Sequence, residues 1–307
     1  MRALAGRSVR FTAELEKRLK ETYPVFAGIV ARSEAEFGET WVEDIASNLG
    51  TLFGPRDDPR WKEALKGYAL LSLDTLRSQH YLEQNGRYEA TDYDFIRSRY
   101  WENRDFMLAS YLPGIFVSHF LWPQHYRLLG FYRGEVVPRV SRWGLKRFAE
   151  VGTGPGLYSK ETLVRIPGCT GIGYDISEHS LAFTSRVMHA FGVGDRYQVE
   201  RREVSANPAE AVDLVICQEV LEHLEEPFPF LVALRKMVRP GGIAYITAAI
   251  TAAQSDHIYL FRDPAEARQL VEQAGFSIML ERTEATDAAN VRELVPRISA
   301  FLCTVDR

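Results

Sequence analysis

Residues 147–156 read RFAEVGTGPG, a short apolar run that ends in three closely spaced glycines. The segment that follows, 157–166, has the length and periodicity of a helix. A strand, a glycine-rich turn and a helix in this order bring backbone N–H groups to a ligand at the strand's carboxyl end. Counted from Gly152, the third glycine falls at Gly156, and Leu157 occupies the position that the dinucleotide pattern gives to glycine. The turn therefore predicts a ligand site and disfavours an NAD-dependent oxidoreductase.

The sequence around this turn has the pattern of an α/β fold. After Trp143, short apolar runs typical of buried parallel strands alternate with amphipathic segments of helical length. The alternation predicts a doubly wound, mostly parallel sheet. The predicted strands are 147–151, 170–174, 212–218, 242–249, 276–283 and 297–305, and the predicted helices are 157–166, 177–191, 224–238 and 264–274.

The first half of the chain is built differently. Apolar residues recur at helical spacing over 11–52 and 61–84, and Asp92 is suited to cap a helix that runs to Tyr111. All five tryptophans lie in this half. We predict two domains, an all-helical cap over 1–143 and an α/β domain over 144–307.

Composition and charge limit the partners. The 307 residues carry a net charge of −4, and neither half has the basic excess that nucleic acid or an anionic membrane demands. No apolar stretch is long and unbroken enough for a membrane span, and no signal peptide is evident, so we expect a cytoplasmic protein. The cysteines, Cys169, Cys217 and Cys303, are odd in number and far apart, which disfavours disulfides and a cysteine-based zinc site.

A second motif specifies the ligand more closely. The strand 170–174 runs into Asp175, 23 residues after Gly152, at the distance where a carboxylate meets the paired hydroxyls of a ribose. A glycine turn with a carboxylate at this spacing indicates a nucleoside. Capping of the next helix is the alternative role for Asp175.

Four signals in this order resemble those of the class I S-adenosylmethionine-dependent methyltransferases. They are FAEVGTGPG (148–156), GIGYDIS (171–177), DLVICQEVLEHL (213–224) and RPGG (239–242), and the resemblance covers 145–307. It implies a seven-stranded sheet and S-adenosyl-L-methionine as cofactor, with its methionine end on the glycine turn, its ribose on Asp175 and its adenine on Ile176. In place of the family's usual acid after the third strand we assign Glu203 with Val204. The implied cofactor residues are Glu150, Gly152, Thr153, Gly154, Gly156, Asp175, Ile176, Glu203, Val204 and Gln218.

Catalytic side chains are expected where the fourth and fifth strands end, because ligands of open α/β sheets bind outside the carboxyl ends of the strands. Gln218 and Glu219 follow one strand, and Gln254, Asp256 and His257 follow the other. We assign His257 as the first catalytic candidate, with His223 and Glu219 beside it. An orienting or structural role is the alternative for His223.

A divalent metal is a separate hypothesis. Gln218, Asp256 and His257, with His223 nearby, are oxygen and nitrogen donors of the kind that an open metal site uses. The segments SDHIYLF (255–261) and RYWENRDFMLASYLPG (99–114) resemble metal-dependent C-methyltransferase domains of polyketide assembly lines.

The expected function is methyl transfer to a small-molecule acceptor, of a biosynthetic or natural-product kind, held between the helical cap and the sheet. His119, His125, Tyr126 and Tyr259 are candidates for the acceptor pocket. Two alternatives stay open, metal-assisted C-methylation of an acyl or keto substrate and a non-catalytic S-adenosylmethionine sensor. The aromatic-rich helices are also suited to a homodimer interface.

Overall fold

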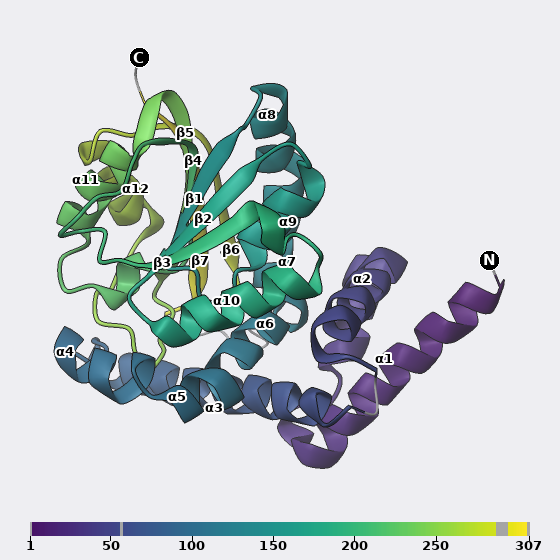
Figure 1. Ribbon diagram of the computed structural model, residues 1–307. Helices are drawn as coiled ribbons and strands as arrows, with labels where there is room; N and C mark the ends of the chain where they lie inside the picture. The colour runs from purple at the N-terminus through teal and green to yellow at the C-terminus, as the bar shows by residue number, and fades with distance from the viewer. Residues whose placement is uncertain (1, 56–57, 287–293, 306–307) are drawn as a thin grey trace.

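The computed structural model describes residues 2–55, 58–286 and 294–305. Seven strands form one sheet in the order β3-β2-β1-β4-β5-β7-β6 (Figure 1). The first five in this order are parallel, and β7 runs antiparallel to both of its neighbours. The predicted fold class is confirmed. The strands are β1 Arg147–Val151, β2 Thr170–Asp175, β3 Tyr197–Arg201, β4 Val212–Cys217, β5 Val238–Ile250, β6 Ser277–Ala285 and β7 Arg297–Thr304.

Four helices cover the two faces of the sheet. They are α9 Leu157–Arg165, α10 Glu178–Ala190, α11 Pro227–Met237 and α12 Pro264–Gln273. Polar caps explain two of the starts, since Ser177 accepts a hydrogen bond at the start of α10 and Asp263 accepts one at the start of α12. The predicted helix 224–238 begins later, at Pro227, because the preceding residues Leu221–His223 form a separate 3₁₀ turn.

The N-terminal part of the described chain is helical throughout. Its helices are α1 Arg2–Thr22, α2 Ile29–Phe53, α3 Pro59–Asn85, α4 Tyr93–Ile96, α5 Arg104–Phe106, α6 Leu112–Leu121, α7 Pro123–Phe131 and α8 Val137–Arg142. The helix expected over 92–111 is broken, because Asn103 caps a new start by accepting from the Phe106 N–H at 3.1 Å. π-helical turns over Arg97–Trp101, Met107–Tyr111 and Tyr132–Val136 complete this part.

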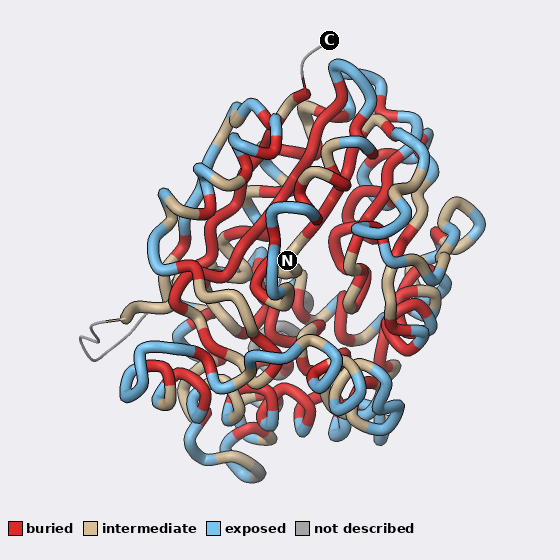
Figure 2. The backbone as a smooth tube through the Cα atoms, turned by 90° about the vertical axis from the view of Figure 1, so that its left-hand side faces the viewer, coloured by how far each residue is buried: buried red, intermediate tan, exposed pale blue. Residues whose placement is uncertain are grey.

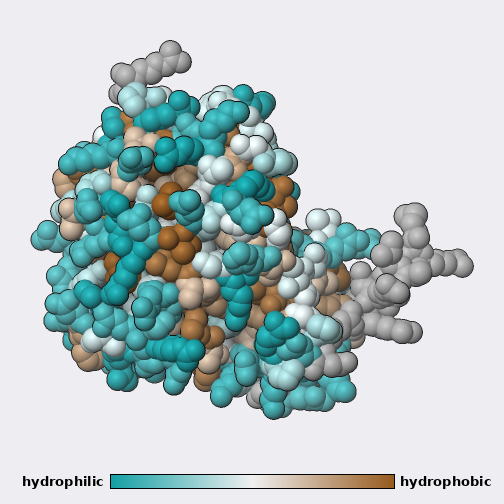
Figure 3. Space-filling view, in the orientation of Figure 1, coloured by the Kyte–Doolittle hydropathy of each residue, from teal (hydrophilic) through white to brown (hydrophobic). Residues whose placement is uncertain are grey.

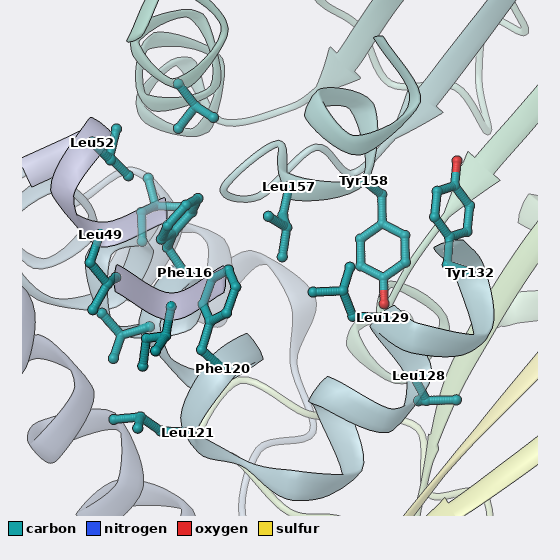
Figure 4. Close-up of a cluster of buried hydrophobic side chains, with 14 of the residues drawn as sticks. Leu49, Leu52, Phe116, Phe120, Leu121, Leu128, Leu129, Tyr132, Leu157 and Tyr158 are labelled. Carbon is teal, nitrogen blue, oxygen red and sulfur yellow. The ribbon is translucent and has the colours of Figure 1, made fainter. Parts of the chain in front are cut away.

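The helical part and the sheet share one apolar core. Figure 4 shows side chains of α2, α6 and α7 packed against Leu157 and Tyr158 of α9, all in one buried cluster. The opposite face of the sheet has a second cluster under α11 and α12. Figure 2 shows the strands as the most continuously buried segments, while the helices alternate between buried and exposed faces.

The helix α3 fixes the helical part to the carboxyl end of the sheet. Gln79 accepts the Ala253 N–H at 3.0 Å and donates to the Thr251 carbonyl at 3.1 Å, and the Tyr88 hydroxyl donates to the Ala252 carbonyl at 2.7 Å. In Figure 1 this helix runs beneath the sheet. The helices therefore cap the end of the sheet where the strands carry their polar loops.

The outer surface adds two findings. The face in Figure 3 is mainly hydrophilic, with hydrophobic residues in scattered patches. Among the described residues no single helix has the length and apolar composition to cross a membrane, although the bent pair Arg104–Leu121 and Pro123–Arg142 meets both conditions together. All three cysteines are buried and free.

Candidate functional site

The glycine turn after β1 forms one wall of a cavity of about 480 Å³. Gly152 has φ +72°, and a Cβ atom there would lie 2.3 Å from Cγ2 of Val220, so glycine is required on two counts. Val151–Pro155 line the cavity. Gly156 does not line it: with φ +70° it caps the start of α9 instead.

Asp175 lies at the end of β2 in the cavity wall. Its carboxylate accepts the Ser177 N–H at 2.8 Å and, at 3.4 Å, both the Gly154 N–H and the Thr153 hydroxyl. Burial raises the pKa of Asp175, and these hydrogen bonds oppose the rise. The residue thus holds the glycine turn and presents a carboxylate to the cavity.

The segment after β3 and the end of β2 provide the neighbouring wall. Ile176, Glu203 and Val204 line the cavity together, although Ile176 and Val204 come from different strand ends. The sequence assigned all three to adenine. In the structure all three line the same cavity as Asp175, at the carboxyl end of the sheet, as this assignment requires.

Glu150 lies behind the turn and does not line the cavity. It is 2% exposed, and its carboxylate accepts the Ser159 N–H in the first turn of α9 at 3.2 Å. Burial raises the pKa of Glu150 to about 8. In this position Glu150 orients α9 relative to β1. The resemblance had instead implied that Glu150 contacts the methionine end of the cofactor.

Gln218 and Glu219 follow β4 and line the cavity. His119 Nδ1 donates to the Ile115 carbonyl, so its Nε2 accepts from Gln218 Nε2, at 3.3 Å. Glu219 has φ +50°, and its carboxylate accepts the Thr247 hydroxyl of β5 at 2.6 Å. Burial raises the pKa of Glu219 to about 7.

Two histidines lie together where the loops after β4 and β5 meet. The rings of His223 and His257 have centroids 4.9 Å apart at 84°, and both line the cavity. His223 Nδ1 donates to the Asp256 carbonyl at 2.9 Å and His257 Nδ1 to the Ala252 carbonyl at 2.8 Å. Because a carbonyl oxygen only accepts, each Nδ1 carries a proton. Burial, followed by the charge of His223, lowers the pKa of His257 to about 4, so the ring is neutral at neutral pH.

Asp256 is not in the cavity wall. Its Oδ2 accepts the Tyr111 hydroxyl at 2.8 Å and the Trp101 Nε1–H at 3.3 Å, both from the helical part. Gln218, the other oxygen donor of the predicted metal set, is bound to His119. Of that set only His257, with the nearby His223, belongs to the metal-ligand cluster that the structure forms.

Glu222 is a functional candidate that the sequence reasoning missed. It is fully buried, it lines the cavity, and neither carboxylate oxygen has a hydrogen-bond partner within the described part of the chain. The ligand atoms of Glu222, His223 and His257 lie within 4.8 Å of one another. The sequence feature that could have identified Glu222 is its position three residues after Glu219, in a segment that follows a buried strand.

The helical part supplies the rest of the cavity. His119 and His125 line it, as the sequence predicted, together with Trp101, Met107, Tyr111, Ile115 and Trp122. Tyr126 and Tyr259 do not. Tyr126 packs on Phe37 and Phe120, and the Tyr259 hydroxyl donates to Glu266 at 3.2 Å.

Comparisons with known proteins find similarity to methyltransferases. Residues 149–244 match a family model described as a methyltransferase domain. A protein named ubiquinone biosynthesis O-methyltransferase from Rhizobium etli is 30% identical over 165 residues, which are 50% of this chain and 63% of that protein. One of the same name from Pseudomonas syringae is 32% identical over 117 residues, 38% of this chain and 48% of that protein. The alignments thus span less than two thirds of these relatives.

Two solved structures share the fold. An O-methyltransferase family protein from Burkholderia thailandensis has a TM-score of 0.57 at 13% identity, covering 84% of this chain and 76% of the other. Human N-acetylserotonin methyltransferase, solved in complex with S-adenosylmethionine, has a TM-score of 0.56 at 14% identity, covering 84% and 74%. These two matches show that the chain has the fold of these methyltransferases, and the family-model match places a methyltransferase domain over 149–244.

Proposed function

We propose that this protein transfers the methyl group of S-adenosylmethionine to a hydroxyl oxygen of a small aromatic acceptor. The observation that carries the proposal is that one cavity contains both the glycine turn with Asp175 and the aromatic side chains of the helical cap. The names of the sequence relatives support an oxygen acceptor, and the word ubiquinone in them supports a hydroxylated ring.

The chemistry of the wall residues fits the cofactor. Asp175 offers a half-buried carboxylate to a ribose diol, and Ile176 and Val204 offer apolar surface to a purine. The turn at Gly152 leaves room for a ligand against the backbone. When bound, S-adenosylmethionine supplies an electrophilic methyl group on its sulfonium. The chain's own task is to align the two reactants and to exclude water.

The helical cap forms the acceptor chamber. Its wall combines aromatic and apolar side chains with a few fixed polar groups, which is the composition of small-molecule pockets. His119 of the cap fixes the amide of Gln218 after β4, and both side chains line the cavity. Trp101 and Tyr111, which end two π-helical turns of the cap, hold Asp256 and thereby the loop that carries His257.

An acceptor hydroxyl loses its proton as the carbon–oxygen bond forms, so the site needs a group that promotes this loss. His257 and His223 line the cavity with Nδ1 of each ring bound to a backbone carbonyl, and the carboxylate of Glu222 lies within 4.8 Å of a ring nitrogen of each. We assign these side chains to activation of the acceptor. Glu219, tied to Thr247, shapes the end of β4 beside them.

Titration calorimetry tests the cofactor assignment. We expect micromolar binding of S-adenosylmethionine and S-adenosylhomocysteine and none of NADH. Asp175→Ala should weaken binding about 100-fold, because charge-assisted hydrogen bonds contribute about 1.5–3 kcal/mol each. Asp195→Ala, an exposed carboxylate outside the cavity, is the matched control and should bind normally.

Turnover is then measured as S-adenosylhomocysteine formed with a panel of phenols and catechols. Tight NADH binding without S-adenosylmethionine binding would overturn the proposal. Cofactor binding without product from any acceptor would favour the sensor alternative.

A further inference from the structure

The structure assigns a divalent transition-metal site to Glu222, His223 and His257, at which a bound cation would activate the acceptor hydroxyl. This inference rests on the proposed function for the role of the cation, but the site itself is argued from geometry. The three side chains come from the 3₁₀ turn after β4 and the loop after β5, and their ligand atoms lie within 4.8 Å of one another.

Hydrogen bonds orient the imidazoles of His223 and His257 as metal ligands. Both Nδ1 atoms donate to backbone carbonyls of the loop after β5, which fixes the tautomer and the ring orientation. Such outer hydrogen bonds are the usual support of metal-binding histidines. Asp256 adds a negative charge behind them, with Oδ2 3.7 Å from His223 Nδ1.

Glu222 provides the independent observation. A fully buried carboxylate without a hydrogen-bond partner is costly, and native structures seldom keep one unless an ion or water satisfies it. Arg and Lys side chains supply no ion pair to Glu222 among the described residues. A cation between this carboxylate and the two imidazoles would satisfy all three groups.

The donor set indicates the class of metal. Two imidazole nitrogens and one carboxylate suit Mn²⁺, Fe²⁺, Co²⁺ or Zn²⁺, whereas Mg²⁺ and Ca²⁺ prefer oxygen ligands. Three protein ligands leave coordination positions open, and here they face the cavity that also contains the cofactor wall. A Lewis acid at this place would lower the pKa of an acceptor hydroxyl. The hydroxyl proton then goes to water, the carbon–oxygen bond forms and the carbon–sulfur bond breaks, with no change of oxidation state.

Metal binding is measured on the full chain without cofactor or acceptor. After chelator treatment and dialysis, the protein is titrated with Mn²⁺, followed by the EPR signal of the free ion, and with Co²⁺, followed by visible absorption. We expect one ion per chain for each metal and much weaker binding of Mg²⁺. Glu222→Gln and His257→Ala should each weaken Mn²⁺ binding at least about 100-fold, since even outer-shell changes cost 10–100-fold.

Controls separate a metal site from general damage. His189→Ala removes an exposed histidine of α10 and should leave Mn²⁺ binding unchanged. Circular dichroism melting shows whether Glu222→Gln folds, and calorimetry of metal-free protein shows whether it still binds S-adenosylmethionine. The wild type should lose S-adenosylhomocysteine production on chelation and regain it with Mn²⁺ or Co²⁺.

The outcomes distinguish the two proposals. No stoichiometric ion in the wild type, or equal affinity in Glu222→Gln and His189→Ala, would overturn the metal site even if the enzyme is active. Metal binding with no binding of S-adenosylmethionine would support the metal site and overturn the proposed function.

Discussion

Gln79, near the C-terminal end of α3, accepts the Ala253 N–H at 3.0 Å, across 174 residues of sequence. The same side chain donates to the Thr251 carbonyl, so one buried amide satisfies two backbone groups of the loop after β5. That loop carries His257 four residues further on. The helical cap therefore determines where a proposed catalytic side chain lies, and the cap and the sheet form one functional unit.

Gln79→Ala should lower the free energy of unfolding by about 2–4 kcal/mol, because each buried group left unpaired costs about 1–3 kcal/mol. Gln84→Ala, on the exposed side of the same helix, should lower it by less than about 0.5 kcal/mol. Urea denaturation of the two variants measures the difference. Equal stabilities would show that Gln79 does not hold the loop.

A buried charge cluster joins the cap to α9. Arg133 donates to both carboxylate oxygens of Glu161 at 2.7 Å and also pairs with Asp44 of α2. Arg133→Ala removes one of three cationic partners of Glu161, which is 3% exposed and still pairs with Lys160 and Arg165. The loss should destabilise the protein by about 1.5–3 kcal/mol, the usual contribution of a hydrogen bond to a charged group. Arg139→Ala breaks a more exposed pair with Glu135 and should cost less than about 1 kcal/mol. A loss below about 1 kcal/mol for Arg133→Ala in urea denaturation would contradict the inferred role of the cluster.

The sheet could be predicted because its signals are local. Each strand end carries a glycine or an acid within the same short window as its apolar run, as in 147–156. The start of β5 could not be predicted. The pairing of β4 with β5 shifts register between Val212 and Leu214, and Val238 pairs with Val212 before the exposed RPGG segment. The π-helical turns of the cap could not be predicted either, since their residues have ordinary helical periodicity.

The sequence predicted which strand ends carry the site residues, but it could not predict the hydrogen-bond partners of those residues. Sequence placed Asp256 and His257 at the end of β5, where both lie. It could not show that Tyr111 and Trp101, more than 140 residues away, donate to one carboxylate oxygen of Asp256, or that neither carboxylate oxygen of Glu222 has a partner in the described part of the chain. Which donor is left over for a ligand is a property of the tertiary structure.

The glycine turn gives a prediction with a closely matched control. Gly152→Ala combines a positive φ with a contact of 2.3 Å to Val220, so binding of S-adenosylmethionine should be lost. Gly192→Ala has nearly the same φ, +69°, but nothing within 4 Å of the new Cβ and no contact with the cavity. It should cost roughly 1–2 kcal/mol of stability and leave binding unchanged. Calorimetry and thermal melting measure both effects, and normal binding by Gly152→Ala would contradict the assignment of the turn.

Glu150 gives the stability a distinctive pH dependence. Burial raises its pKa in the folded protein to about 8, with the hydrogen bonds from Ser159 opposing the rise, whereas glutamate in an unfolded chain has a pKa of about 4.3. Between these values the folded state keeps a proton that the unfolded state releases. The free energy of unfolding therefore falls as the pH rises through this window, and the fall ends once the folded state also ionises.

Glu150→Gln tests this directly, because the amide keeps the shape and can accept the Ser159 N–H but has no proton to lose. The variant should gain stability relative to the wild type as the pH rises from 5 to 8, by on the order of a few kcal/mol, since one pKa unit corresponds to about 1.4 kcal/mol. Urea denaturation at several pH values measures the gain, with the exposed Glu210→Gln as control. A stability difference independent of pH would mean that Glu150 is already ionised in the folded protein, and its carboxylate would then need a cationic or hydrogen-bonding partner besides Ser159.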